Sequence, residues 1–155
     1  MKTERRSMLK KITLSVLGFA GLRSIAKAET ISDEKKKIVS GVVMDQEVPL
    51  FSGSTKFGNL VFVAGKGAHY AGDIKAHTET VLQELEKELI KAGSSMKNVL
   101  KVSVFLNDIA DYDGMNSVYR GRFGSAPPVR TTVAVAKGGV PGNSLVEMDC
   151  IAFIS

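Results

Sequence analysis

The spacing of apolar and polar residues predicts strands and helices from residue 38 to the C-terminus. Short apolar or β-branched runs predict six strands, over 38–43, 49–54, 60–64, 99–106, 130–136 and 145–153. Between the third and fourth runs, apolar residues recur every three or four positions, which predicts a helix over 74–92. The same spacing predicts a second helix that starts at Asp108 or Asp111 and ends at Gly124. The predicted element order is β-β-β-α-β-α-β-β.

This order predicts an α+β fold in a single domain, with one mixed sheet and two helices packed on one of its faces. Valine, methionine and isoleucine occupy both faces of several predicted strands. The sheet face without helices must therefore be covered as well, and self-association would cover it.

The N-terminus has the features of an export signal. Five lysines and arginines in the first 11 residues precede an apolar run over 12–22, and the sequence AKA at 26–28 forms a cleavage site. The run is short for a bilayer span, which favours a cleaved signal over a stable membrane anchor. The arginine pair at 5–6 resembles a twin-arginine motif. The sequence thus predicts a periplasmic or extracellular protein with a signal peptide at 1–28, a flexible polar segment at 29–37 and a domain at 38–155.

Removal of the predicted signal changes the charge balance. The whole sequence has a net charge of +5, but residues 29–155 contain 14 basic and 15 acidic residues. A near-neutral domain lacks the concentrated positive field that phosphate binding requires, so no nucleic-acid partner is expected. Cys150 is the only cysteine, and its alternation with Met148 and Ala152 predicts a small buried side chain rather than a reactive thiol.

One predicted strand carries an arginine that needs a partner. After Pro127 and Pro128, which disfavour helix, Arg130 begins a run of β-branched and small residues. Arg130 shares a strand face with Thr132 and Ala134. An arginine in this position can reach water, pair with a carboxylate of the protein or bind an anionic ligand, and the residues alone leave these alternatives open.

A carboxylate near the C-terminus is a second candidate. Glu147 shares a face of the last strand with Asp149, away from Met148 and Cys150. In a cleft, a carboxylate can activate water or transfer a proton. The alternative is that Glu147 pairs with Arg130, which would make both residues structural.

A glycine-rich stretch at 65–72 lies between a predicted strand and a predicted helix, where phosphate-binding loops occur. Its spacing matches neither the dinucleotide-binding motif nor the P-loop. The two histidines, His69 and His77, lack the spacing of metal ligands. No metal or other cofactor is therefore expected.

Four motifs in order resemble the Rid (YjgF) family of reactive intermediate deaminases. They are GNLVFVAG at 58–65, AG at 92–93 followed by VLKVSVFLND at 99–108, MNxxYxxxF at 115–123, and PxR at 128–130 followed by VEM at 146–148. The resemblance runs from about residue 48 to the C-terminus. It implies the chorismate-mutase-like (YjgF-like) fold and a homotrimer with ligand clefts between subunits.

The resemblance also implies roles for individual residues. Arg130 matches the family arginine that holds the substrate carboxylate through two parallel hydrogen bonds, and Glu147 matches the family glutamate near the water. Thr132 stands where many relatives have cysteine, and the backbone carbonyl at that position helps to place the water. Gly65 matches a glycine whose backbone amide contacts the carboxylate.

Two further positions match residues of the family site. Phe51 aligns with a tyrosine that lines the cleft, so the ring is present but the hydroxyl is missing. Asn116 matches a helix asparagine of the family, with a solvent-facing helix position as an equal alternative.

The resemblance implies an exported, cofactor-independent hydrolase similar to 2-iminobutanoate/2-iminopropanoate deaminases. Such proteins convert enamines and imines, for example 2-aminoacrylate, to 2-keto acids and ammonia. The expected partners are a small carboxylate-bearing imine or keto acid and further copies of the chain. The alternative is a non-catalytic trimer that binds small carboxylate metabolites in clefts between its subunits.

Overall fold

The computed structural model describes residues 36–155, which form six strands and two α-helices. The predicted signal peptide and most of the polar segment after it lie outside the described residues. In chain order the elements are β1 (Ile38–Asp45), β2 (Val48–Phe57), β3 (Leu60–Gly67), α1 (Ile74–Lys91), β4 (Val99–Leu106), α2 (Tyr112–Tyr119), β5 (Val129–Ala134) and β6 (Val146–Phe153). Short 3-10 helices precede β4, α2 and β6. The predicted element order and the α+β class are confirmed.

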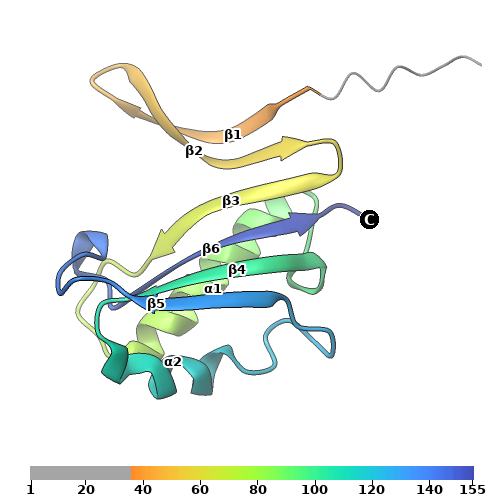
Figure 1. Cartoon of the computed structure of the whole chain (residues 1–155). Helices are drawn as coiled ribbons and strands as arrows, with labels where there is room; N and C mark the ends of the chain where they lie inside the picture. The colour runs from red at the N-terminus through yellow and green to blue at the C-terminus, as the bar shows by residue number, and fades with distance from the viewer. Residues whose placement is uncertain (1–35) are drawn as a thin grey trace, which may run out of the picture. The chain divides into compact units, whose positions relative to one another are not determined.

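All six strands belong to one mixed sheet with the order β1-β2-β3-β6-β4-β5 (Figure 1). Neighbouring strands are antiparallel except β4 and β5, which run parallel. A parallel pair needs a crossover connection, and α2 lies in the connection between β4 and β5. β1 and β5 are the two edge strands of the sheet.

The two hairpins use different turns. β2 and β3 are joined through the predicted pair Gly58-Asn59, and Gly58 has a φ of +60°. In the turn between β1 and β2, Gln46 and Glu47 have φ values of 46° and 67°, which side-chain-bearing residues rarely adopt. Two residues with positive φ match the twist of the flanking strands, so this hairpin forms without a turn glycine. β2 extends beyond the predicted 49–54 because 55–57 continue the ladder with β3.

The core lies between the sheet and α1. Every second residue of β6 is buried, and α1 presents an apolar stripe to these side chains, formed by Val81, Leu82, Leu85 and Leu89. The carboxylate of Asp73 caps α1 by accepting a hydrogen bond from the Ala76 N–H (2.8 Å). Gly93 follows the C-terminal cap of α1 with a φ of +85°, so the cap glycine stands where the sequence predicts it.

The second helix is shorter than the sequence predicts. α2 ends at Tyr119, and Gly121 and Gly124 adopt φ values of 82° and 78° in the turns that follow. Phe123 is nevertheless buried, so the apolar spacing correctly indicated burial at a position that is no longer helical. Asp108 accepts a hydrogen bond from Ala110 at the start of the 3-10 helix before α2, whereas Asp111 makes no side-chain capping bond to α2.

Cys150 is buried, as its alternation with Met148 and Ala152 predicts. Its side chain packs in the core, and the residue is 2% exposed. Burial raises the pKa of the thiol to about 12. The thiolate is the reactive form of cysteine, so Cys150 is inert at neutral pH.

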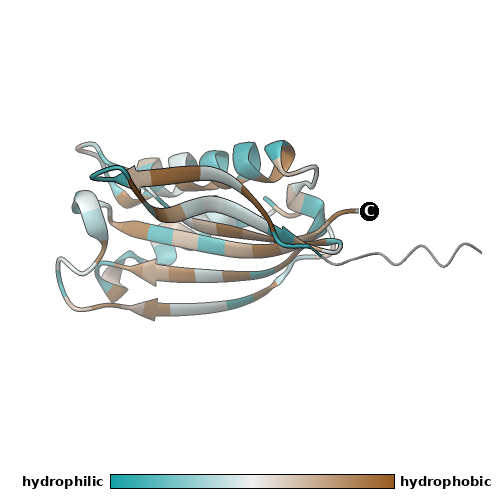
Figure 2. Cartoon of the chain, turned by 90° about the horizontal axis from the view of Figure 1, so that it is seen from above, coloured by the Kyte–Doolittle hydropathy of each residue, from teal (hydrophilic) through white to brown (hydrophobic). Residues whose placement is uncertain are grey.

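The sheet face opposite the helices carries exposed apolar side chains; Figure 2 shows α1 on one side of the sheet and apolar stretches along the strands. Strand register places five of them on this open face, with exposures of 41% to 70%: Val39, Phe57, Phe62, Val129 and Val133. A face of this composition is typical of an interaction surface. Within residues 36–155, no helix is long and apolar enough to cross a membrane.

Candidate functional site

Arg130 lies on the helix-covered face of the edge strand β5. Its register partner on β4 is Val102, a fully buried core residue. The half-buried Arg130 side chain reaches α2, where Nη1 donates to Asn116 Oδ1 (2.8 Å) and Nη2 donates to Tyr112 Oη (3.2 Å). The guanidinium carbon also lies 4.7 Å from the centroid of the Tyr119 ring, within cation–π range. One helix therefore holds the guanidinium from several sides.

The partners of Arg130 are all neutral, which bears on the alternatives left open by the sequence. Among residues 36–155, no carboxylate forms an ion pair with Arg130. A guanidinium has five N–H donors, so three of them remain after the bonds to Asn116 and Tyr112. A positioned positive charge with free donors is the arrangement that binds a carboxylate ligand.

Sequence reasoning identified Asn116 as a site residue but missed Tyr112 and Tyr119. The three residues occupy positions i, i+4 and i+7 of α2, so they share one face of the helix. This spacing is visible in the sequence and was the available signal. Asn116 is partly buried and bonded to Arg130, so the solvent-facing alternative for this residue is wrong.

Thr132 follows Arg130 on the same strand face, with buried Val104 as its register partner. The Thr132 hydroxyl oxygen is buried and has no hydrogen-bond partner among the described residues, and the same holds for Tyr119 Oη. Burial raises the pKa of the Tyr119 phenol to about 12, so this hydroxyl is protonated at neutral pH. Two unpaired hydroxyls thus lie on the helix-covered side of β5, near Arg130.

Glu147 and Gly65 meet on the opposite face of the sheet. Glu147 is opposite Phe105 of β4 and Gly67 of β3, and as predicted it alternates with buried residues and shares its face with Asp149. A Cβ on Gly65 would collide with Oε1 of Glu147. Only glycine at this position lets the glutamate lie across the backbone of β3.

Buried Ser144 fixes the loop that leads into β6. Its hydroxyl accepts a hydrogen bond from the Ala68 N–H (2.9 Å) and donates one to the Val146 carbonyl (2.6 Å). Ala68 comes directly after β3, and Val146 begins β6. The serine therefore ties together the two strand ends next to Glu147.

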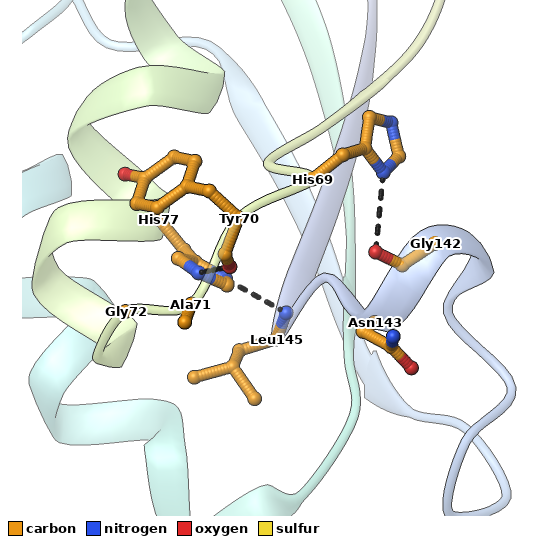
Figure 3. Close-up of a pocket in the computed structure, with 8 residues that line it drawn as sticks. All are labelled: His69, Tyr70, Ala71, Gly72, His77, Gly142, Asn143 and Leu145. Atoms are coloured by element: carbon orange, nitrogen blue, oxygen red, sulfur yellow. Dashed lines mark hydrogen bonds between the residues drawn. The ribbon is translucent and has the colours of Figure 1, made fainter.

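A hollow of about 420 Å³ lies beside His77 and is lined by His69, Tyr70, Ala71, Gly72, Gly142, Asn143 and Leu145 (Figure 3). His77 is buried, and its Nδ1 accepts a hydrogen bond from the Leu145 N–H (3.1 Å) while Nε2 donates to the Tyr70 carbonyl (2.9 Å). These bonds require the neutral imidazole with its proton on Nε2. Both ring nitrogens are engaged with backbone, so we assign His77 a structural role.

Within residues 36–155, no three His, Cys, Asp or Glu side chains gather as metal ligands.

Phe51 lies far from Arg130 within one chain. It is 53% exposed on β2 and lines a separate hollow of about 500 Å³ on the β1–β2 hairpin. β2 and β5 are four places apart in the strand order, which corresponds to about 19 Å at the usual strand spacing. The predicted site residues therefore occupy three separate places in one chain. Arg130, Thr132 and Asn116 lie beside β5. Gly65 and Glu147 lie on the open face of the sheet, and Phe51 lies on the β1–β2 hairpin.

Comparisons with known proteins identify the family. The family model described as Endoribonuclease L-PSP matches residues 45–154. A RutC family protein of Pyrococcus abyssi is 38% identical over 110 residues, covering 66% of this chain and 85% of that protein. A Dermatophagoides farinae protein named 2-iminobutanoate/2-iminopropanoate deaminase is 27% identical over 126 residues, covering 77% of this chain and 97% of that protein. The crystal structure of yeast Mmf1 matches with a TM-score of 0.66 at 30% identity, covering 76% of this chain and 94% of that one. The chain therefore belongs to the L-PSP (YjgF/RutC) family, which includes imine deaminases.

Proposed function

We propose that this protein hydrolyses small carboxylate-bearing imines to 2-keto acids and ammonia. The observation that carries the proposal is the Arg130 guanidinium, which α2 positions through neutral partners and which keeps three N–H donors free of bonds to the part of the chain that the structure describes. Two parallel hydrogen bonds from Arg130 to the substrate carboxylate fix the adjacent imine carbon. The name of the Dermatophagoides farinae relative describes substrates of this kind.

The proposed reaction consumes one water and needs no exchange of electrons. Water adds to the imine carbon while a proton moves to the nitrogen, and the carbinolamine then loses ammonia as the carbonyl forms. An enamine such as 2-aminoacrylate first becomes the imine by moving a proton from nitrogen to carbon. We assign the proton transfers to Glu147, which takes a proton from the attacking water and returns it to the departing nitrogen.

A second copy of the chain completes the proposed site. Arg130 and Glu147 lie on opposite faces of the sheet, so their side chains do not converge on one substrate within one chain. The exposed apolar face offers a surface for assembly. We propose a homotrimer in which β5 of one copy, with Arg130, meets the open face of the next copy, with Gly65 and Glu147.

Phe51 favours a second candidate function, a trimer that binds small carboxylates without hydrolysing them. A phenyl ring can pack against a ligand, but it cannot donate a hydrogen bond to the ligand or to a water molecule. Arg130 serves as a carboxylate anchor in either protein. The two functions differ in whether water is activated, and an assay of imine loss separates them.

The family description names an endoribonuclease, but the charge of residues 29–155 does not support RNA as the substrate. Residues 29–155 contain 14 basic and 15 acidic residues. RNA binding draws its affinity from concentrated positive charge facing the phosphates. A small carboxylate held by one arginine needs no such surface.

The test of the proposed function uses the chain from residue 29 onward. An amino-acid oxidase generates imines, and semicarbazide traps the imine that remains. We expect the protein to lower the yield of the trapped product in proportion to its concentration. If the yield is unchanged while calorimetry detects Arg130-dependent binding of 2-oxobutanoate, the binding function holds; if the protein neither hydrolyses nor binds, Arg130 is not a carboxylate anchor.

We further propose that residues 1–28 direct export and are then removed. The support is the basic segment, the apolar run and the AKA cleavage sequence. Fractionation of cells followed by mass spectrometry of the N-terminus checks this. We expect the exported form to begin at Glu29, whereas a cytoplasmic protein that retains residues 1–28 would contradict the proposal.

A further inference from the structure

The helix-covered side of β5 contains two polar atoms that the fold leaves unsatisfied. Tyr119 Oη and Thr132 Oγ1 are both buried and have no hydrogen-bond partner among residues 36–155. Buried polar atoms in native proteins are nearly always paired, so each exception calls for an explanation. An unpaired buried hydroxyl costs the free energy of removing it from water, and an apolar group of the same shape would avoid that cost.

Docking of a second copy does not by itself supply the missing partners. Both oxygens are already buried within a single chain, so a surface contact cannot reach them. They become accessible only when a neighbouring group moves. Two groups lie against the Tyr119 ring: the half-buried guanidinium of Arg130, whose central carbon is 4.7 Å from the ring centroid, and the buried ring of Phe123, whose centroid is 4.9 Å away. Of these two groups, only the guanidinium is partly exposed, so Arg130 is the group that a ligand can displace.

We propose that Tyr119 is a further binding residue of this site, whose hydroxyl is uncovered when Arg130 turns toward a ligand and then donates a hydrogen bond to the ligand carboxylate. The proposal rests on the proposed function, because it takes Arg130 as the carboxylate anchor. A carboxylate has more acceptor positions than two parallel arginine bonds occupy. The raised pKa of the phenol keeps its proton in place, so the hydroxyl acts as a neutral donor.

Two of the three tyrosines of the chain provide a matched test. Tyr70 Oη is fully engaged, because it donates to the Ala76 carbonyl (2.9 Å) and pairs with Thr80 Oγ1 (2.8 Å) away from α2. Tyr119→Phe removes an unpaired hydroxyl, whereas Tyr70→Phe removes a paired one. The two changes therefore differ in their expected effects on stability and on binding.

The experiment measures thermal stability and the affinity for 2-oxobutanoate by calorimetry. For Tyr119→Phe we expect an unchanged or higher Tm and about tenfold weaker binding, the loss of one hydrogen bond to a charged group. For Tyr70→Phe we expect a lower Tm and unchanged binding. Unchanged affinity in Tyr119→Phe, or a lower Tm, would overturn the role given to its hydroxyl.

The outcomes also separate this inference from the proposed function. If Arg130→Ala loses 2-oxobutanoate binding but Tyr119→Phe keeps it, the anchor stands and the tyrosine has no part in binding. If Tyr119→Phe weakens binding in a protein that does not hydrolyse imines, the inference stands and the catalytic proposal fails. If the wild-type chain neither binds 2-oxobutanoate nor hydrolyses imines, both are overturned.

Discussion

Replacement of Arg130 by lysine is expected to lower kcat/KM for imine hydrolysis about 100-fold, because two charge-assisted hydrogen bonds together contribute about 3 kcal/mol. Lysine keeps the charge but cannot form two parallel bonds to a carboxylate. It also cannot reproduce the bonds that the guanidinium makes to Asn116 and Tyr112. Arg130→Ala removes the charge as well, and we expect its activity to fall below detection. Steady-state kinetics against imine concentration measures the loss and shows how much of it lies in KM.

Arg122→Lys is the control for this change. Arg122 lies in the turns after α2 and donates to both carboxylate oxygens of Glu79 at 2.7 and 2.8 Å, which holds the pKa of Glu79 below its usual value. This pair is partly exposed, and its side chains bond neither Arg130 nor Glu147, so its loss costs little stability. We expect the control to keep the wild-type kcat/KM. Wild-type kinetics in Arg130→Lys would mean that Arg130 does not anchor the substrate.

A mixture of two inactive variants is expected to regain activity. Arg130→Ala and Glu147→Gln each remove one half of the proposed site, so each protein alone should be inactive. In mixed oligomers, some interfaces pair an intact Arg130 from one copy with an intact Glu147 from the next. Random pairing at equal amounts makes about a quarter of the sites complete, because a cyclic interface takes one residue from each side. The activity is measured after the two proteins are unfolded, mixed and refolded together.

The control mixes Arg130→Ala with the double variant Arg130→Ala/Glu147→Gln. No copy in that mixture carries Arg130, so no interface is complete and no activity should return. Light scattering after size-exclusion chromatography confirms that both mixtures assemble. If the first mixture also stays inactive while its oligomers form, Arg130 and Glu147 do not act across an interface, and the shared site is wrong.

The fold was predictable because it depends on local periodicity. Alternation of burial along β6 and the three-to-four spacing along α1 are written directly in the sequence, and both elements form where they were predicted. The end of α2 was not predictable from spacing, because Phe123 continues the apolar pattern into a turn. Over such a short segment, the spacing of apolar residues indicates which residues are buried but cannot show whether the backbone there is helical.

The site was predictable only in its parts. Alternation shows that Glu147 and Asp149 share a face, and that Arg130 and Thr132 share a face, but each statement refers to one strand alone. Relating the two strands requires the order β6-β4-β5 and the register through Phe105, which are tertiary properties. The separation of Phe51 from Arg130 by strand order is hidden from the sequence for the same reason.

Because β5 lies at the edge of the sheet, a chain can fold completely before the proposed site is complete. Within residues 36–155, β5 pairs only with β4, and α2 already holds Arg130 before any second copy arrives. In the proposed arrangement, a single folded chain has a packed core and a positioned Arg130, but it lacks the Glu147 of a second copy and is therefore inactive. Turnover then begins only where copies associate, so the total activity rises more steeply than the protein concentration, and dilute single chains do not act on substrate.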